Sequence, residues 1–207
     1  KLTYNITSES VAYFKQFTND YVNAGLIQSG KVSNVDSFVN DLIDSSHLEA
    51  AAGIQPVQQG TPLITVRIGY LAGDLHQFAR VVAENTEVGG GRSLFATYGI
   101  NPVVPSGAPS AGYANGGDVM TAFASTENII DMAHLGAPPV LLRHANNAID
   151  VKILSLANTE GSALVVSGDR TIDDLDGLVI GQPGSSSIQY LLLVAIAEKY
   201  GYDLVRA

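Results

Sequence analysis

The chain has 207 residues, a net charge of -9 and no cysteine. Its 11 lysines and arginines are scattered, so we expect no surface that attracts nucleic acid. The absence of cysteine excludes disulfides, thiolate catalysis and cysteine-based zinc sites. The strongest apolar run, 191–197, is far shorter than the ~20 residues that cross a bilayer. The first residue is Lys1, not methionine, which indicates a processed product or part of a longer protein.

Residues 1–57 are predicted to be helical. Apolar residues recur at helical spacing from Val11 to Tyr21, after a candidate N-cap at Thr7. A second helix is expected from about Asp36. Residues 58–63 read as a linker that is rich in glutamine, glycine and proline.

Beyond the linker, predicted strands alternate with predicted helices. The strands are nearly all apolar, which is typical of a mostly parallel sheet buried on both faces and therefore of an α/β fold. In such sheets, ligands collect at the carboxyl ends of the strands. We expect strands over 63–70, 101–104, 129–134, 151–157, 162–167 and 178–182, helices over 75–84, 118–125, 138–145 and 185–200, and a capped turn over 171–175.

The first candidate site is the turn at Ser185, Ser186 and Ser187, between a predicted strand and a predicted helix. Free backbone amides at a helix N-terminus favour an anion, and the three hydroxyls add hydrogen-bond donors. The simpler interpretation is that one of these serines only caps the helix.

The second candidate is the turn that follows the strand 63–70. Asp74 and His76 offer an acceptor and a donor at the end where a ligand is expected to lie. Alternatively, Asp74 only caps the next helix.

Two further candidates are backbone sites. Gly136 and Ala137 would expose amides beside a ligand just before Pro138 starts a helix, whereas we assign His134 to the preceding strand. Ser162 and Ala163 lie in a segment that reads either as a crossover facing a cleft or as a plain loop.

The sequence predicts no catalytic residue, metal site or cofactor. The four histidines lack metal-ligand spacing, and no pair of side chains suits acid–base catalysis. Most of the candidate groups are neutral donors, which suit holding a solute more than transforming it.

Four segments, read in order, resemble a known family. They are VRIGYLAGDLHQFARVVAEN, GGDVMTAFASTENIIDMAHLGAPPVLLRHANN, VKILSLANTEGSALVVSGD and DRTIDDLDGLVIGQPGSSSIQYLLLVAIAEKYGYD. Together they resemble the extracytoplasmic solute-binding proteins of ABC importers, of the nitrate, sulfonate and taurine type.

The resemblance implies a type II periplasmic binding protein fold, with a first lobe over 64–174 and the start of an incomplete second lobe over 175–207. Residues 1–57 resemble the helices that end such proteins, so the segment order resembles the tail of one copy joined to the head of the next. These helices are expected to pack on the first lobe.

The implied function is extracytoplasmic capture of a small solute, with anions among the candidates, for delivery to an ABC permease. The chain would not be an enzyme. The alternative is a structural subunit of an extracellular filament or surface assembly, in which copies of the chain bind one another.

Overall fold

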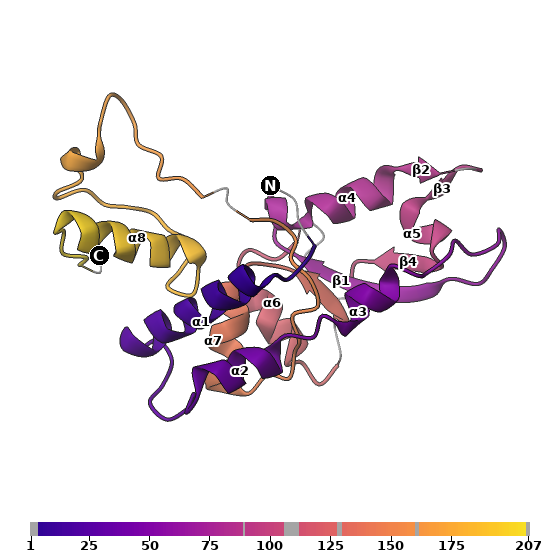
Figure 1. Cartoon of the computed structure of the whole chain (residues 1–207). Coiled ribbons are helices and arrows are strands. Elements are labelled where there is room, and N and C mark those ends of the chain that lie inside the picture. The colour runs from indigo at the N-terminus through magenta and orange to yellow at the C-terminus, as the bar shows by residue number, and fades with distance from the viewer. Residues whose placement is uncertain (1–3, 89, 106–111, 128–129, 160–161, 206–207) are drawn as a thin grey trace.

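Figure 1 shows a computed structural model of the chain, which describes residues 4–88, 90–105, 112–127, 130–159 and 162–205. The architecture is mixed α/β, with a small parallel sheet and flanking helices. The helices are α1 (Ser8–Asn23), α2 (Val35–Leu42), α3 (Ser46–Ala51), α4 (Phe78–Asn85), α5 (Leu94–Thr97), α6 (Gly116–Phe123), α7 (Ala137–Asn147) and α8 (Ile188–Tyr200), with 3-10 turns η1 (Leu75–Gln77) and η2 (Ile172–Asp174). The strands are β1 (Ile64–Tyr70), β2 (Glu87–Val88), β3 (Arg92–Ser93), β4 (Ile100–Val103) and β5 (Met132–His134).

The main sheet has the strand order β4-β1-β5, and both pairs are parallel. The first strand in sequence is therefore central, and the chain crosses to one side for β4 and to the other for β5. Crossover connections between parallel strands are right-handed. Two crossovers that leave β1 in opposite directions therefore place their helices on opposite faces of the sheet. In Figure 1, α4 lies above β1, and α6 and α7 lie below it.

Arg67 on β1 clamps Asp131, the residue just before β5. The Arg67 Nε donates to Asp131 Oδ2 at 3.0 Å, and the Arg67 backbone amide donates to the same oxygen at 2.8 Å. The Asp131 amide returns a hydrogen bond of 2.9 Å to the Arg67 carbonyl. The guanidinium hydrogen bond lowers the pKa of Asp131. This two-way contact fixes the register of β5 against β1 and aligns their carboxyl ends.

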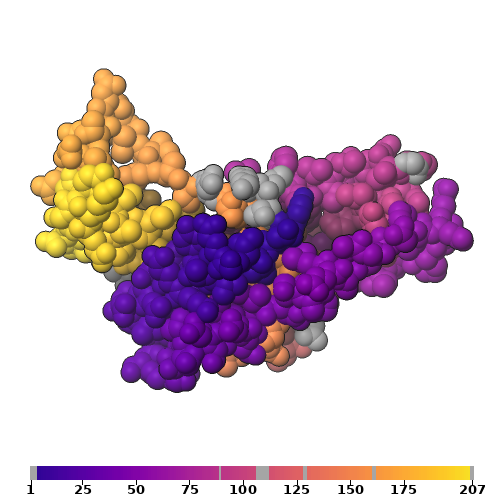
Figure 2. All heavy atoms as spheres, viewed as in Figure 1, coloured from indigo at the N-terminus to yellow at the C-terminus, as the bar shows by residue number. Residues whose placement is uncertain are grey.

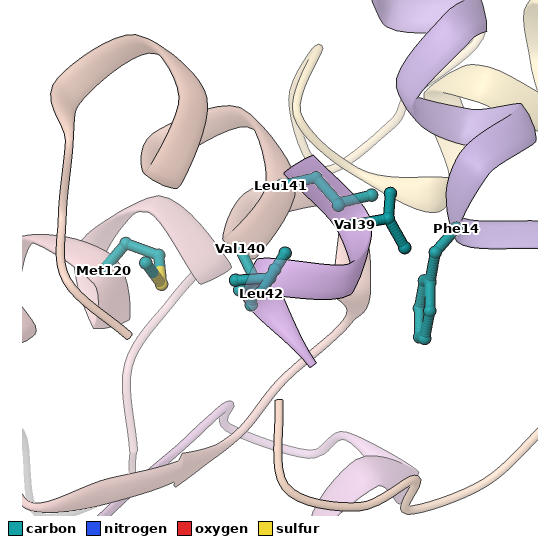
Figure 3. Close-up of a cluster of buried hydrophobic side chains, with 6 residues drawn as sticks. All are labelled: Phe14, Val39, Leu42, Met120, Val140 and Leu141. Atoms are coloured by element: carbon teal, nitrogen blue, oxygen red, sulfur yellow. The ribbon is translucent and has the colours of Figure 1, made fainter. Parts of the chain in front are cut away.

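The main core joins the N-terminal helices to the sheet layer, as the resemblance predicts. Figure 3 shows the buried cluster, in which α1 and α2 side chains meet those of α6 and α7. Its members are Phe14, Val39, Leu42, Met120, Val140 and Leu141. The helix pattern predicted for 1–57 is confirmed over α1 and α2, and Thr7 caps α1 by accepting from the Ser10 amide at 3.2 Å.

Three predicted strands are wrong. Residues 151–157 make only a single parallel bridge, between Ile153 and Ile43, because backbone hydrogen bonds to the N-terminal helical segment are made at Ile153 and do not continue as a ladder. Residues 162–167 and 178–182 form no strand, because no ladder of backbone hydrogen bonds joins them to each other or to another described segment. The predicted strands 63–70 and 101–104 are confirmed as β1 and β4, each within one residue.

The predicted helices and the capped turn are present, with shifted ends. The helix predicted over 75–84 is divided into η1 and α4, and the last helix begins at Ile188. Thr171 and Asp174 cap each other at η2, as the capped turn predicts.

Residues 162–205, which we call the C-terminal arm, lie to one side of the molecule. Figures 1 and 2 show it in orange and yellow at the left. Among its described residues, only Leu175 and Ala197 are buried hydrophobics. Leu191 of α8 packs against a cluster around Tyr21 and Leu142, which attaches the arm to α1 and α7.

Candidate functional site

The carboxyl ends of β1 and β5 lie side by side. Tyr70, the last residue of β1, pairs with His134, the last residue of β5. The strands that follow β1 in sequence lie on opposite sides of it, so this end is the topological switch point where α/β proteins bind ligands. The two turns beyond the strands also meet, because a Cβ placed on Gly136 would lie 3.5 Å from His76 Nε2.

Asp74 and His76 are both engaged in this turn. Asp74 accepts from the His76 amide at 2.9 Å and so caps η1, and its Oδ1 also lies 3.6 Å from His76 Nε2. His76 Nδ1 lies 2.7 Å from Asn158 Oδ1. Because an amide oxygen only accepts, Nδ1 carries the hydrogen and the neutral ring keeps its lone pair on Nε2. The nitrogen that approaches Gly136 is therefore an acceptor in neutral His76 and a donor in protonated His76.

Gly136 and Ala137 form the N-terminus of α7. Gly136 is the N-cap, and no side chain caps the helix there. Pro138 and Pro139 follow and carry no N–H, so the amides of Gly136 and Ala137 are the donors that this helix end can offer. Both prolines are buried, and Gly116 leaves the room for one of them, since a Cβ on Gly116 would lie 2.5 Å from Pro139 Cγ.

Arg80 and His134 complete the cluster. The Arg80 guanidinium carbon lies 4.3 Å from the centre of the Tyr70 ring, and its Nη2 donates to Gln77 Oε1 at 2.6 Å. Its Nη1 forms an ion pair with Glu84. Its Nε is buried, with no hydrogen-bond partner among the described residues. Burial lowers the pKa of His134, with further lowering by the charges of Arg80 and His76, so the ring is neutral near pH 7.

Sequence reasoning missed the roles of Arg80 and His134. His134 was assigned to the strand, and it does end β5, but that end faces the site. Arg80 had a sequence signal, because it follows His76 by four residues and helical spacing places such residues on one face.

The structure does not bring the other predicted site residues to this cluster. Among the described residues, no hydrogen bond joins Ser162, Ala163 or Ser185–Ser187 to the turns of His76 and Gly136. Ser187 caps α8 by accepting from the Tyr190 amide at 3.1 Å, which is the simpler interpretation of that turn. Ser162, Ala163 and Ser185 are exposed.

Two other features bear on function. In the part of the chain that the structure describes, no group of three or more His, Asp or Glu side chains is arranged to hold a metal ion. Within the same ranges, no helix combines the length and the apolar character needed to span a membrane.

Comparison with known proteins gives no relative. No family model, no curated protein and no solved structure matches the chain.

Proposed function

We propose that the protein binds a small solute reversibly at the switch point of its sheet and delivers it to an ABC importer outside the cytoplasm. One observation carries the proposal: the turns after two paired parallel strands approach so closely that a Cβ on Gly136 would lie 3.5 Å from His76 Nε2. Side-chain and backbone polar groups from two turns thus meet at the sheet edge where α/β proteins hold ligands.

The strand order supports the proposed relationship to type II periplasmic binding proteins. A parallel sheet whose first strand is central has a switch point beside that strand, and the candidate site occupies this position. In this interpretation, residues 64–174 form the first lobe, which contributes one wall of the site, and the part of the C-terminal arm from residue 175 onward begins the second lobe.

The polar groups favour a solute that bears an acceptor oxygen, such as a small anion. The amides of Gly136 and Ala137 point from a helix N-terminus, which is the positive end of the helix dipole. Arg80 adds a permanent positive charge nearby, and His76 becomes a second donor on protonation. The described cluster holds no activated nucleophile, so binding without a covalent step is the chemistry proposed.

Ligand-dependent thermal unfolding tests this function. The panel contains small inorganic anions, sulfonates and neutral heterocycles, each added to the purified chain. A solute at 100 times its Kd should add about 2.7 kcal/mol to the free energy of unfolding. For a chain of this size, that raises Tm by about 5–11 °C.

Two glycine variants make the test specific to the site. Gly136→Ala places a methyl group beside His76 Nε2 at a backbone angle, φ of -65°, that alanine adopts without strain. Gly181→Ala is the matched control, because a Cβ there has open space around it. Gly136→Ala should abolish the ligand-induced rise in Tm, and Gly181→Ala should keep it. A panel in which no solute stabilises the wild type, or a rise that Gly136→Ala leaves intact, would refute the proposed site.

A further inference from the structure

A cavity of about 500 Å³ lies at the C-terminal end of α7, away from the switch point. It forms where the loop after α1 and the helix α2 meet the end of α7, and its lining residues are Lys31, Phe38, His144, Ala145, Ala148 and Asp150. Its volume falls within the range of small-molecule sites. The 11-residue helix α7 is about 16 Å long, so a ligand in this cavity would not touch Gly136 at the other end of the helix.

Two opposite charges line this cavity, and neither is neutralised within the chain. Lys31 and Asp150 are both exposed, and among the described residues neither side chain takes part in an ion pair or a hydrogen bond. Their charged groups therefore lie more than 4.0 Å apart, although they belong to one cavity. Both charges remain free to pair with a ligand.

His144 and Phe38 form the aromatic side of the cavity. The His144 Nδ1 lies 2.8 Å from the carbonyl oxygen of Ile149, and the His144 and Phe38 ring centres are 5.4 Å apart. Because a carbonyl oxygen only accepts, Nδ1 carries the hydrogen and the neutral ring keeps its lone pair on Nε2. Nε2 has no hydrogen-bond partner in the part of the chain that the structure describes. This side therefore offers an apolar face and one free acceptor.

The end of α7 favours a positive group. Ala148 is the C-cap, with φ of 52°, and among the described residues it is the only non-glycine with a positive φ. Within the same ranges its amide donates no backbone hydrogen bond to α7. The last carbonyls of the helix carry the negative end of its dipole, so an ammonium group beside Asp150 is stabilised by both.

The Lys31 side of the cavity is attached to α7. The Asn146 side chain accepts from the Gln28 amide at 2.9 Å and donates to the Leu26 carbonyl at 2.8 Å. The Lys31 amide donates to the Gln28 carbonyl at 3.1 Å. The loop that carries Lys31 is therefore held against the helix that carries His144, so the two sides are positioned before a ligand binds.

We propose that this cavity binds a zwitterionic amino acid with an apolar side chain. The carboxylate of the ligand pairs with Lys31, and its ammonium group donates to Asp150 and to His144 Nε2. The apolar side chain of the ligand packs against Phe38. A ligand of one sign would leave one of the two charges unmatched, and an uncharged ligand would leave both. This site has its own residues and does not depend on solute binding at the switch point.

Isothermal titration calorimetry with L-phenylalanine tests the site. The wild type should bind with a Kd below about 1 mM. Lys31→Met and Asp150→Asn should each weaken binding about fivefold, the effect of one partly exposed charge pair. Lys199→Met and Asp176→Asn are the matched controls, because both residues are exposed and lie outside the cavity. The controls should change the Kd less than about twofold, since distant exposed charges are screened. A wild type that does not bind phenylalanine, or controls that weaken binding equally, would overturn the proposal.

Two analogues of phenylalanine separate the two ends of the ligand. Phenylalaninamide has no carboxylate and N-acetylphenylalanine has no ammonium group, so each should bind the wild type about fivefold more weakly. Lys31→Met should not weaken phenylalaninamide binding further, because that analogue lacks the group that Lys31 binds. For the same reason, Asp150→Asn should not affect N-acetylphenylalanine. Equal binding of all three compounds to the wild type would overturn the recognition of a zwitterion.

Gly136→Ala distinguishes this site from the switch point. Its added methyl group lies beside His76 at the other end of α7, so the variant should bind phenylalanine with an unchanged Kd. Loss of phenylalanine binding in this variant would place the amino acid at the switch point, which overturns this proposal and leaves the proposed function standing. Phenylalanine binding that persists when no anion or heterocycle stabilises the chain would support this site and remove the proposed function.

Discussion

The docking of the N-terminal helices onto the α/β layer can be tested with a single side chain. Leu42 on α2 is completely buried and lies in the cluster drawn in Figure 3, beside Met120 of α6 and Val140 of α7. Its carbonyl also accepts from the Ile153 amide at 2.8 Å. Leu42→Ala removes the side chain and leaves this backbone bond in place, so the variant measures the packing alone.

The expected cost is about 3 kcal/mol, near the middle of the 2–5 kcal/mol range for buried leucine. The flexible Met120 side chain can fill part of the cavity, which keeps the cost from the upper end. For 207 residues, this lowers Tm by about 6–12 °C. Leu192→Ala on α8 is the matched control, because Leu192 is 41% exposed and its truncation should cost less than about 0.5 kcal/mol.

Urea unfolding followed by circular dichroism provides the measurement. If residues 1–57 and the sheet layer unfold as one unit, Leu42→Ala should lower the urea concentration at the midpoint of unfolding. The dependence of the unfolding free energy on urea concentration should stay the same as in the wild type. A cost below about 1 kcal/mol for Leu42→Ala would refute the packing argument. Two separate transitions, with the helices melting first, would refute the inference that they share one core.

Three further variants test individual contacts in urea unfolding. The buried Tyr21 hydroxyl has no hydrogen-bond partner among the described residues, so Tyr21→Phe should leave the stability unchanged or raise it by up to about 1 kcal/mol, and a larger loss would contradict this. Asp131→Asn should cost about 0.5 kcal/mol at neutral pH, because the ion pair with Arg67 is partly exposed. The pKa of Asp131 is lowered in the folded state, so the difference in stability between wild type and Asp131→Asn should persist above about pH 4 and disappear as the pH falls below it. A difference in stability that does not change with pH would refute the ion pair as its cause. Gly116→Ala should cost about 1–3 kcal/mol because its Cβ would overlap Pro139, and a neutral effect would show that the two helix ends can separate.

Local signals predicted the helices well. Apolar residues at helical spacing and a threonine cap define α1, and both signals depend only on residues close in sequence. The strand β1 was also predictable, because its apolar run is flanked by a linker and a turn. Boundaries shifted where a cap was ambiguous, as at Ser187, which ends a run of three serines.

The wrong strands share one physical cause. The runs 151–157, 162–167 and 178–182 have the composition of buried strands, but a strand exists only where a neighbour offers hydrogen bonds. Ile153 has such a neighbour at Ile43, more than a hundred positions away in sequence, but only over a single bridge. No local pattern reports whether a distant segment will lie beside a run for long enough to form a ladder.

The site was predictable in its position and not in its composition. Asp74, His76 and Gly136 follow strands directly, so the rule that ligands bind at carboxyl strand ends found them. Predicting Arg80 as a site residue required its four-residue spacing from His76 along a helix. Predicting His134 required knowing that β5 ends at this residue, close to the turn of His76. Sequence order alone did not supply the second fact.

The contact between His76 and Asn158 connects the candidate site to the C-terminal arm. Asn158 lies just before the C-terminal arm, so its 2.7 Å contact with His76 fixes the point from which the arm leaves the site. A solute that displaces this contact would release the start of the arm, whereas a solute that leaves it intact would find the arm already positioned. In sequence, the arm begins only four residues beyond Asn158. A solute that binds beside His76 is therefore expected to be coupled to the position of the arm through the contact with Asn158.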